Sequence, residues 1–289
     1  MDLKIIASEI RDILENRRKR ISLTFEEDEH VYTMKDLDGE LKTNFPSVST
    51  VIKYFHDEFD SEAKSFQKAR GNLKAQQKLL EEWKYSADYA SNTGSRVHFE
   101  LESYLITLYD NYKEVRQPVF ECNETQILVG DRMIKAGKDF IELMHKRGSV
   151  LLDTESVLGS PEFGYTGQPD KIWLFDNKGE LGFIVTDWKT NKPKNFEVQW
   201  FTNMMYEPFE YLHNTALGHY NLQLPLYTKL FLNMLRGSKY EDIKFLGGII
   251  VLLKDDATYE EYRIPKKVSQ KILEMDIKQY MLESKKEVI

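Results

Sequence analysis

The spacing of apolar residues predicts several amphipathic helices. Residues 3–20 carry apolar side chains at helical intervals, and the same periodicity covers 124–146, where Gly148 ends the pattern. Further helices are expected over 220–235 and 266–283, and a highly charged helical region over 61–108, interrupted near Asn92–Gly94. The expected buried face of the first helix consists of Ile5, Ile6, Ile10, Ile13 and Leu14.

Extended segments are predicted where short apolar runs alternate with turn residues. Residues 22–33 and 40–45, with a turn at Asp38-Gly39, indicate a β-hairpin, and Ser47 is placed to cap a short helix over 48–55. Three consecutive strands are expected in the later half of the chain, followed by an apolar strand and a polar one. Their ranges are 150–158, 167–175, 182–187, 245–253 and 259–264.

This order of elements favours an α/β protein with a helical N-terminal elaboration. No low-complexity linker or repeat divides the chain, so a single domain over 1–289 is expected. Within it, 1–148 would be mainly helical with the hairpin, 149–265 the sheet core with one helix, and 266–289 a C-terminal helix.

Composition narrows the class of protein. Of 289 residues, 41% are apolar and 30% charged, which is typical of a globular chain. The net charge of −7 disfavours a protein that coats duplex DNA over its whole surface, although a local basic groove remains compatible with it. No apolar run is long enough to span a membrane, and the N-terminus becomes charged too early for a secretory signal, so a cytoplasmic protein is expected.

Cysteine usage restricts the metal chemistry. Cys122 is the only cysteine, so the chain cannot form an internal disulfide or hold an iron–sulphur cluster on several thiolates. A bound metal would have oxygen or imidazole ligands, which favours Mg²⁺ or Mn²⁺.

The strongest chemical signal is an acid followed two residues later by a lysine. Asp187 and Lys189 end an apolar strand, and strand periodicity places both on one face. Such a carboxylate can hold a divalent ion while the ammonium orients or deprotonates a water. Asp170 opens the preceding strand, so the two acids can share a metal if the strands are adjacent and antiparallel. Asp-x-Lys by itself is far more often a surface ion pair.

Two helical pairs add to this signal. His98 and Glu102 are four residues apart, as are Gln223 and Tyr227, so each pair shares a helix face. Taken alone, the first pair is ordinary, and the second belongs to an amphipathic helix whose core side chains would be Leu222, Leu226, Leu230 and Phe231.

Together these motifs resemble the RecB-type branch of the PD-(D/E)XK nucleases. Gly94 to His98, Gly167 to Asp170, Asp187 to Lys189 and Gln223 to Tyr227 occur in the order of that branch. The branch includes RecB and AddAB nuclease domains, CRISPR-associated iron–sulphur exonucleases, the mitochondrial genome-maintenance exonuclease and phage exonucleases. The segment from Phe45 to Ser49 is also similar to single-domain members, and the resemblance covers roughly residues 30–255.

The resemblance implies a restriction-endonuclease-like mixed sheet flanked by helices, and it assigns roles. His98, Asp170, Asp187 and the Trp188 main-chain carbonyl would bind Mg²⁺ or Mn²⁺, and Lys189 would position the attacking water. Gln223 and Tyr227 would support Lys189 or contact DNA. Glu102 and Glu155 are further carboxylates, either metal ligands or solvated acids. The chain departs from the iron–sulphur members because it lacks their cysteines.

Cations near these motifs are candidates for phosphate contacts. They are Arg96, Lys171, Lys192 and Lys194, with the basic run Arg17–Arg20 as another candidate or a solvated helix end. An aromatic-rich stretch between Lys189 and Gln223 would be a lid, a strand-separating wedge, a base-stacking surface or a packing element. Its aromatic residues include Trp200, Phe201, Tyr206, Phe209 and Tyr211.

The expected function is metal-dependent hydrolysis of DNA. An exonuclease acting on ends or single strands in recombination, repair or phage DNA processing is favoured, with a structure-specific or restriction-type endonuclease as the alternative. A catalytically silent DNA-binding or assembly module is the alternative of another class. The chain has no P-loop, so a helicase or recombination partner would be a separate protein. Polarity, strand preference, the number of metals and the oligomeric state stay open.

Overall fold

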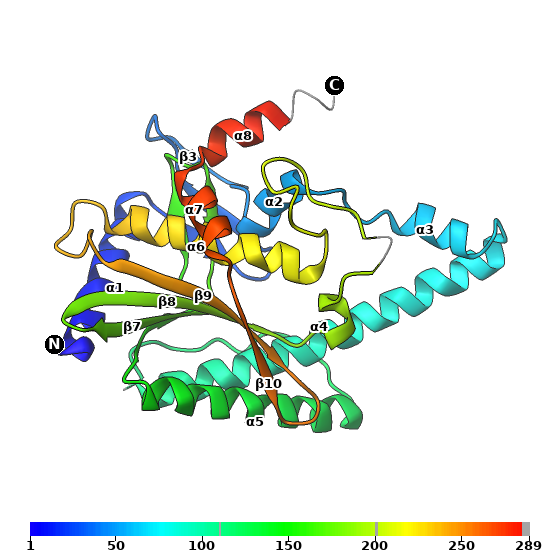
Figure 1. Ribbon diagram of the computed structural model, residues 1–289, viewed down its shortest axis with the longest axis horizontal. Coiled ribbons are helices and arrows are strands. Elements are labelled where there is room, and N and C mark those ends of the chain that lie inside the picture. Colours follow the sequence, from blue (N-terminus) through cyan, green and yellow to red (C-terminus); the bar gives the residue numbers. More distant parts are fainter. Residues whose placement is uncertain (110, 200–201, 285–289) are drawn as a thin grey trace.

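The computed structural model describes residues 1–109, 111–199 and 202–284. At its centre lies a five-stranded mixed sheet with the order β10-β9-β8-β7-β4, flanked by helices on both faces (Figure 1). All neighbouring pairs are antiparallel except β8 and β9, which are parallel. The strands are β4 (Val150–Thr154), β7 (Lys171–Asn177), β8 (Glu180–Lys189), β9 (Lys244–Leu253) and β10 (Tyr259–Arg263). The expected α/β class is confirmed.

Two layers of helices bury the two faces of this sheet. On one face lie α1 (Leu3–Arg20) and α6 (Ala216–Leu235), and on the other lies α5 (Glu124–Lys146), itself packed against α4 (Leu73–Leu108). Each face has its own apolar cluster. Phe183 and Phe231 belong to the first cluster, and Trp173 and Trp188 to the second. Because side chains of a strand alternate between faces, the central strands are apolar on both sides.

The bounds of α1 and α5 agree with the predicted ones. Asp2 caps α1 by accepting hydrogen bonds from Lys4 N and Ile5 N, and Asn123 forms a capping box with Gln126 at the start of α5. The buried face of α1 is Leu3, Ala7, Ile10 and Leu14. Ile5, expected on that face, is 58% exposed.

The predicted interruption near Asn92–Gly94 is wrong. The helix α4 runs through it, because Gln126 from α5 donates to the Tyr89 carbonyl and to Thr93 Oγ1, and Thr93 itself binds the Tyr89 carbonyl. The break lies between α3 (Ser61–Lys68) and α4, where Arg70 and Gly71 have positive φ.

Three other predicted elements are divided. Two of the predicted strands, 150–158 and 167–175, each contain part of a small separate sheet, formed by β5 (Leu158–Ser160) and β6 (Tyr165–Gly167). The C-terminal helix is split into α7 (Lys266–Glu274) and α8 (Ile277–Ser284), because Met275 is extended and the α7 carbonyls of Ile272 and Leu273 accept hydrogen bonds from the buried Lys229.

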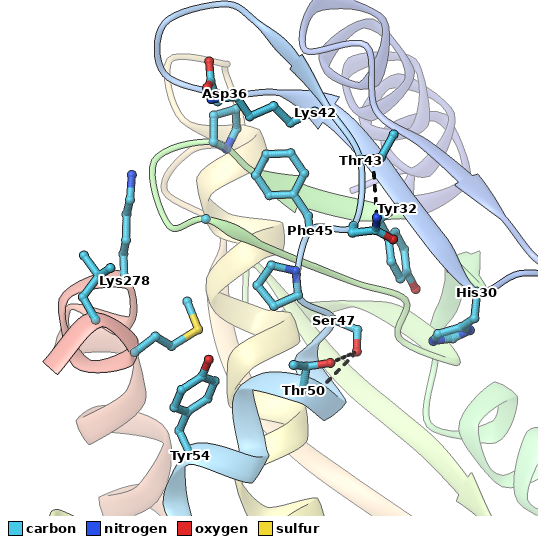
Figure 2. A pocket seen from close by; sticks show the side chains of 16 residues that line it. His30, Tyr32, Asp36, Lys42, Thr43, Phe45, Ser47, Thr50, Tyr54 and Lys278 are labelled. Atoms are coloured by element: carbon cyan, nitrogen blue, oxygen red, sulfur yellow. Dashed lines mark hydrogen bonds and ion pairs between the residues drawn. The ribbon is translucent and has the colours of Figure 1, made fainter. Parts of the chain in front are cut away.

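The predicted N-terminal hairpin is a three-stranded sheet. Its strands are β1 (Thr24–Glu26), β2 (Val31–Lys35) and β3 (Leu41–Lys42), so the expected first strand turns back on itself. As predicted, Ser47 caps the next helix, α2 (Val48–Ile52), which continues as η1 (Lys53–Phe55). The Pro46 carbonyl accepts a hydrogen bond from Thr166 N, which ties this segment to β6. A pocket of about 640 Å³ opens between β2, β3 and α8 (Figure 2).

None of the helices in the described residues is long and apolar enough to cross a membrane.

Candidate metal centre

The pairing of β7 and β8 brings the two predicted acids together. Lys171 stands opposite Thr186 in this antiparallel ladder, so Asp170 and Asp187 are the next pair beyond it. The adjacency and direction that the sequence analysis required are therefore present. Asp170 is 7% and Asp187 2% exposed, so both carboxylates are withdrawn from bulk water.

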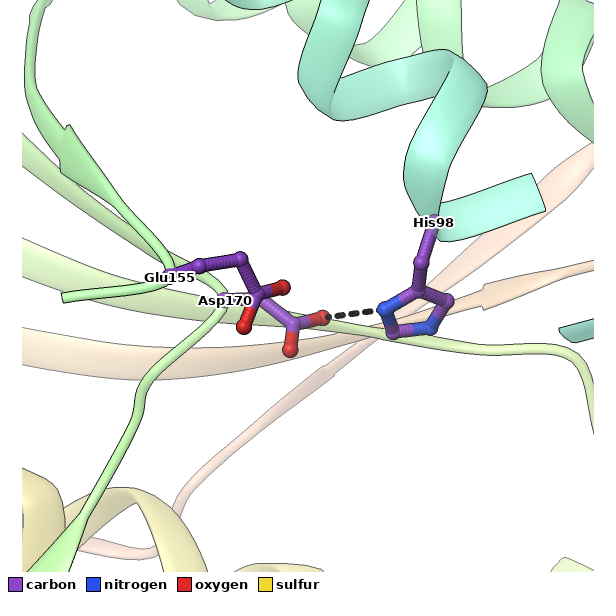
Figure 3. A group of neighbouring side chains, drawn as sticks. All are labelled: His98, Glu155 and Asp170. Carbon is purple, nitrogen blue, oxygen red and sulfur yellow. Dashed lines mark ion pairs between the residues drawn. The ribbon is translucent and has the colours of Figure 1, made fainter. Parts of the chain in front are cut away.

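A histidine and a second acid complete a cluster with Asp170. One ligand atom each from His98, Glu155 and Asp170 lies within 4.8 Å of the others, and the three side chains converge from α4, from the end of β4 and from the start of β7 (Figure 3). His98 Nδ1 is 3.5 Å from Asp170 Oδ2. Glu155, considered only as an additional acid in the sequence analysis, is thus a central member, while Asp187 stands beside this group.

The backbone of Glu155 is held in an unusual conformation. Its φ is 46°, in the left-handed region that non-glycine residues seldom adopt. Its N–H donates to the Asp170 carbonyl at 3.0 Å, and its own carbonyl accepts from Gln168 Nε2 at 3.1 Å. Such a conformation costs on the order of 1 kcal/mol and persists because the surroundings fix it. These two bonds aim the Glu155 carboxylate at the cluster.

Asp170 is the permanently ionised acid of the site. Its Oδ2 accepts a hydrogen bond of 2.7 Å from Trp188 N and lies 3.4 Å from Lys171 Nζ. Burial alone would raise the pKa of Asp170, but Lys171, His98, Lys189 and the Trp188 N–H outweigh it and lower the pKa to about 2.

For Asp187, the effects that raise the pKa outweigh those that lower it. Burial and the neighbouring charge of Asp170 raise the pKa of Asp187 to about 7, although Lys189 acts in the other direction. Lys189 Nζ is 2.5 Å from Asp187 Oδ2, so the Lys189 ammonium is the partner of this buried oxygen. A carboxylate held by a single ammonium can also serve as a ligand for a divalent cation.

Burial and the neighbouring charges set the protonation states of Lys189 and His98. Burial acts to lower the pKa of Lys189, but Asp187, Tyr220 and Asp170 raise it overall, so the side chain stays an ammonium. For His98, burial dominates and lowers the pKa, helped by Lys171 and Lys189 and opposed by Asp170 and by a hydrogen bond to the Trp188 main chain. A neutral imidazole can act as a metal ligand.

The helix α6 forms one wall of the site. Gln223 Nε2 donates to the Tyr227 hydroxyl at 3.0 Å, so the predicted pair is in contact. The Lys189 ammonium lies 4.2 Å from the centre of the Tyr220 ring, whose hydroxyl donates to Asn191. Tyr220 was not singled out in the sequence, although its place three residues before Gln223 puts it on the same helix face.

Two glycines of the motifs allow close packing. A Cβ at Gly167 would lie 2.7 Å from the Tyr227 ring and 2.8 Å from Val48, so only glycine leaves room for the tyrosine beneath β6. A Cβ at Gly94 would be 3.1 Å from Thr190 Oγ1. Gly94 therefore lets α4 approach the end of β8, one turn before His98.

The predicted phosphate-binding cations differ in their placement. Lys192 and Lys194 are exposed beside η2 (Pro193–Phe196), directly after β8. Lys171 is 2% exposed, with its ammonium 3.9 Å from the centre of the Trp188 ring, so it neutralises the buried acids rather than facing solvent. Arg96 binds Asp131 and the Ile127 carbonyl of α5. In the basic run, Arg17 binds the Met234 carbonyl and Arg18 the Val157 carbonyl.

One cation near the site was missed by the sequence analysis. Lys113 Nζ is 3.1 Å from Glu102 and 3.9 Å from Asp153, and it donates to the Thr154 carbonyl. Glu102 therefore has a cationic partner, one helical turn after His98. No spacing rule links residue 113 to β4, so only the fold reveals this contact.

The cluster faces a pocket of about 490 Å³. Its walls come from the N-terminal sheet, from α4 and from residues 113–118, and they include Phe25, His30, Phe99 and Arg116 as well as His98 and Glu155. His30 also borders the pocket of Figure 2.

Three of the aromatic residues named in this stretch by the sequence analysis are described, and they make internal contacts. Phe209 is buried against Phe55, Tyr206 donates to Asp57, and Tyr211 lies under the Lys267 ammonium. Trp200 and Phe201 lie outside the described residues. For the three described rings, the geometry is that of a packing element.

Comparison with known proteins adds no relative: no family model matches the chain, and a search of curated proteins finds no significant similarity. The description of the site therefore rests on its own geometry, which is that of an α/β protein with a buried histidine–acid cluster suited to a metal ion.

Proposed function

We propose that the protein is a Mg²⁺- or Mn²⁺-dependent DNA nuclease of the PD-(D/E)XK type, acting on DNA ends. The observation that carries the proposal is the meeting of Asp170, Asp187 and Lys189 at one end of the β7–β8 ladder, beside His98 and Glu155. The choice of DNA as substrate, and of ends rather than internal sites, rests on the motif resemblance.

The residues fit a hard divalent cation. His98, Glu155 and Asp170 supply imidazole and carboxylate ligands within 4.8 Å, and the buried Asp187 carboxylate lies beside them, paired with Lys189. Oxygen-rich ligand sets with one imidazole suit Mg²⁺ and Mn²⁺. The Trp188 main chain also faces this group, since its N–H binds Asp170, and its carbonyl is proposed as a further ligand. When bound, the ion would offset phosphate charge and lower the pKa of a coordinated water.

The protein groups have separate tasks in the proposed reaction. Lys189 keeps its proton, because Asp187 and Tyr220 raise its pKa. It would therefore position the attacking water and the phosphate oxygen as a charged donor, rather than remove a proton. The attacking water loses a proton to solvent as the new phosphorus–oxygen bond forms, the bond to the leaving sugar oxygen breaks, and that oxygen receives a proton from solvent. The pair Gln223–Tyr227 would hold the wall against which Lys189 is oriented.

The test compares cleavage by wild-type protein and by Lys189→Ala on linear and covalently closed DNA, single- and double-stranded, with Mg²⁺, Mn²⁺ or EDTA. Lys244→Ala is the matched control, because Lys244 is an exposed lysine at the start of β9, whereas Lys189 pairs near the other end of that strand. We expect metal-dependent degradation of linear DNA, reduced about a hundredfold to a thousandfold in Lys189→Ala and unchanged in Lys244→Ala.

The outcomes separate the alternatives. Cleavage of closed circles identifies an endonuclease, since an exonuclease needs an end. DNA binding with no cleavage under either metal refutes the catalytic proposal and leaves a DNA-binding or assembly module.

A further inference from the structure

The first half of α4 leaves the body of the protein. No residue from Leu73 to Asn92 is buried, and burial along this helix begins at Thr93. Together with α3, this half forms a helical hairpin, here called the arm (residues 61–92), that extends away from the sheet (Figure 1). A long exposed helix gains little stability from burial, so packing does not explain why this half of α4 extends from the protein.

The tip of the arm is basic in an acidic protein. Residues 63–80 contain five cationic side chains and no acidic residue, although the whole chain has a net charge of −7. All five are exposed, and among the described residues only Lys78 makes an ion pair, with Glu82 at 3.9 Å. The five are Lys64, Lys68, Arg70, Lys74 and Lys78.

The contacts that hold the arm together involve few of these cations. Gln76 binds Glu62, the Phe59 and Trp83 rings lie 5.7 Å apart, and Asn72 caps α4 by accepting from Ala75 N. Lys68 joins this set, with its ammonium 5.1 Å from the Trp83 ring centre, and Lys78 forms only the exposed ion pair with Glu82. The other three make no described side-chain contact within the arm.

The arm stands on the side of α4 that faces the metal centre. Gln76 and Trp83, which contact α3 and the segment before it, precede His98 by close to whole numbers of turns. Lys84 precedes it by nearly four turns, whereas Lys78 and Lys74 lie about 160° and about 120° around the helix from His98. At 1.5 Å per residue, Lys78 is about 30 Å and Lys74 about 36 Å from His98 along the helix. This separation corresponds to about nine to eleven nucleotides of a duplex strand.

We propose that the arm binds the phosphate backbone of nucleic acid about nine to eleven nucleotides from the metal centre. The arm as a whole carries six cationic and four acidic residues, and its tip, residues 63–80, is an exposed run of cations without acids that matches a polyanion. The choice of nucleic acid as the ligand rests on the proposed function. The new element is the distance along the strand between the site of cleavage and the phosphates that the arm binds. Single strands and duplexes carry the same phosphates, so both are probes.

The test neutralises three arm cations, Lys64→Gln, Lys74→Gln and Lys78→Gln, in one protein; of these, only Lys78 makes a side-chain contact within the arm, the exposed ion pair with Glu82. The control carries Lys4→Gln, Lys178→Gln and Lys244→Gln, which removes the same charge from exposed positions outside the arm. Binding of 25-nucleotide and 25-base-pair DNA is measured in EDTA over a salt series, and circular dichroism checks folding. Cleavage of 6-nucleotide DNA is measured with Mg²⁺.

We expect the arm variant to bind 25-mers at least about tenfold more weakly, with a salt slope lower by about two to three for duplex DNA. Its kcat/KM on 6-mers stays within about twofold of wild type, because six nucleotides at the duplex rise span about 20 Å and end short of Lys78 and Lys74. Equal binding by arm variant and control overturns the proposal, and so does an equal loss on 6-mers and 25-mers. If wild type cleaves nothing, the nuclease proposal fails while the binding comparison still decides the role of the arm.

Discussion

The two halves of α4 follow different rules although they form one helix. From Thr93 onward, Val97, Leu101 and Leu105 recur every four residues, are fully buried and fix the helix against α5. From Leu73 to Asn92 the helix is held by α3 and is otherwise exposed. The buried half of α4 fixes the position of His98 in the metal centre, whereas the exposed half extends away from the sheet. Burial density thus separates the part that positions chemistry from the part that extends outward.

The largest expected effect breaks the buried half. Leu101→Ala removes a side chain that covers Gly137, whose added Cβ would lie 2.4 Å from Leu101. The free energy of unfolding should fall by about 3 kcal/mol. Leu73→Ala, at a position 72% exposed on the arm, should change it by less than about 0.5 kcal/mol. Urea unfolding of both variants measures the two changes in free energy. Similar losses of stability in Leu101→Ala and Leu73→Ala would contradict the distinction between the buried and the exposed half of α4.

A bound metal ion should increase the difference in stability between the buried and the exposed half of α4. Saturation at about 100 times the Kd stabilises the site by up to about 2.7 kcal/mol. Hydrogen exchange should slow for amides of residues 94–106 and stay unchanged for 73–90. The pKa of Asp187 is raised to about 7, so below that pH binding must displace its proton. Stabilisation should therefore be larger at pH 8 than at pH 6. Equal protection along α4, or a reversed pH trend, would contradict this prediction.

Glu155→Gln removes the negative charge of the acid that lies beside His98, a residue of the buried half of α4. Burial, Asp170 and Glu102 raise the pKa of Glu155, so the metal-free folded protein binds this proton more tightly than the unfolded chain does. Wild-type stability is therefore lost as pH rises above the unfolded value, and glutamine, which resembles the protonated acid, avoids that loss. The variant should be more stable by about 1 kcal/mol at pH 8 and by less at pH 5.

The control for Glu155→Gln is Glu100→Gln, an exposed acid on α4, which should leave stability unchanged at both pH values. A glutamine variant that is less stable than wild type at pH 8 would show that Glu155 is held by a favourable charge contact instead.

Much of the site could be predicted because its signals are local. Strand periodicity joined Asp187 to Lys189, and two neighbouring strands sufficed to bring in Asp170. Helix caps fixed the ends of α1 and α5 for the same reason, since each cap involves residues two or three apart.

The parts that were not predicted depend on contacts distant in sequence. The helix continues through Gly94 because Gln126 supplies hydrogen bonds from α5. Lys171 looked like a surface cation, but Trp188 on the neighbouring strand covers it. The importance of Glu155 arises from a left-handed backbone held by the Asp170 carbonyl and Gln168. Periodicity contains none of this information.

The single parallel pair in the sheet, β8 with β9, has a consequence for the shape of the site. An antiparallel neighbour could follow β8 through a short turn, but a parallel one requires the chain to return along the full length of the sheet before the next strand begins. That return path contains α6, and α6 carries Tyr220, Gln223 and Tyr227 past the end of β8. The parallel pairing of β8 with β9 thus places α6 beside the site, where it forms one of the walls.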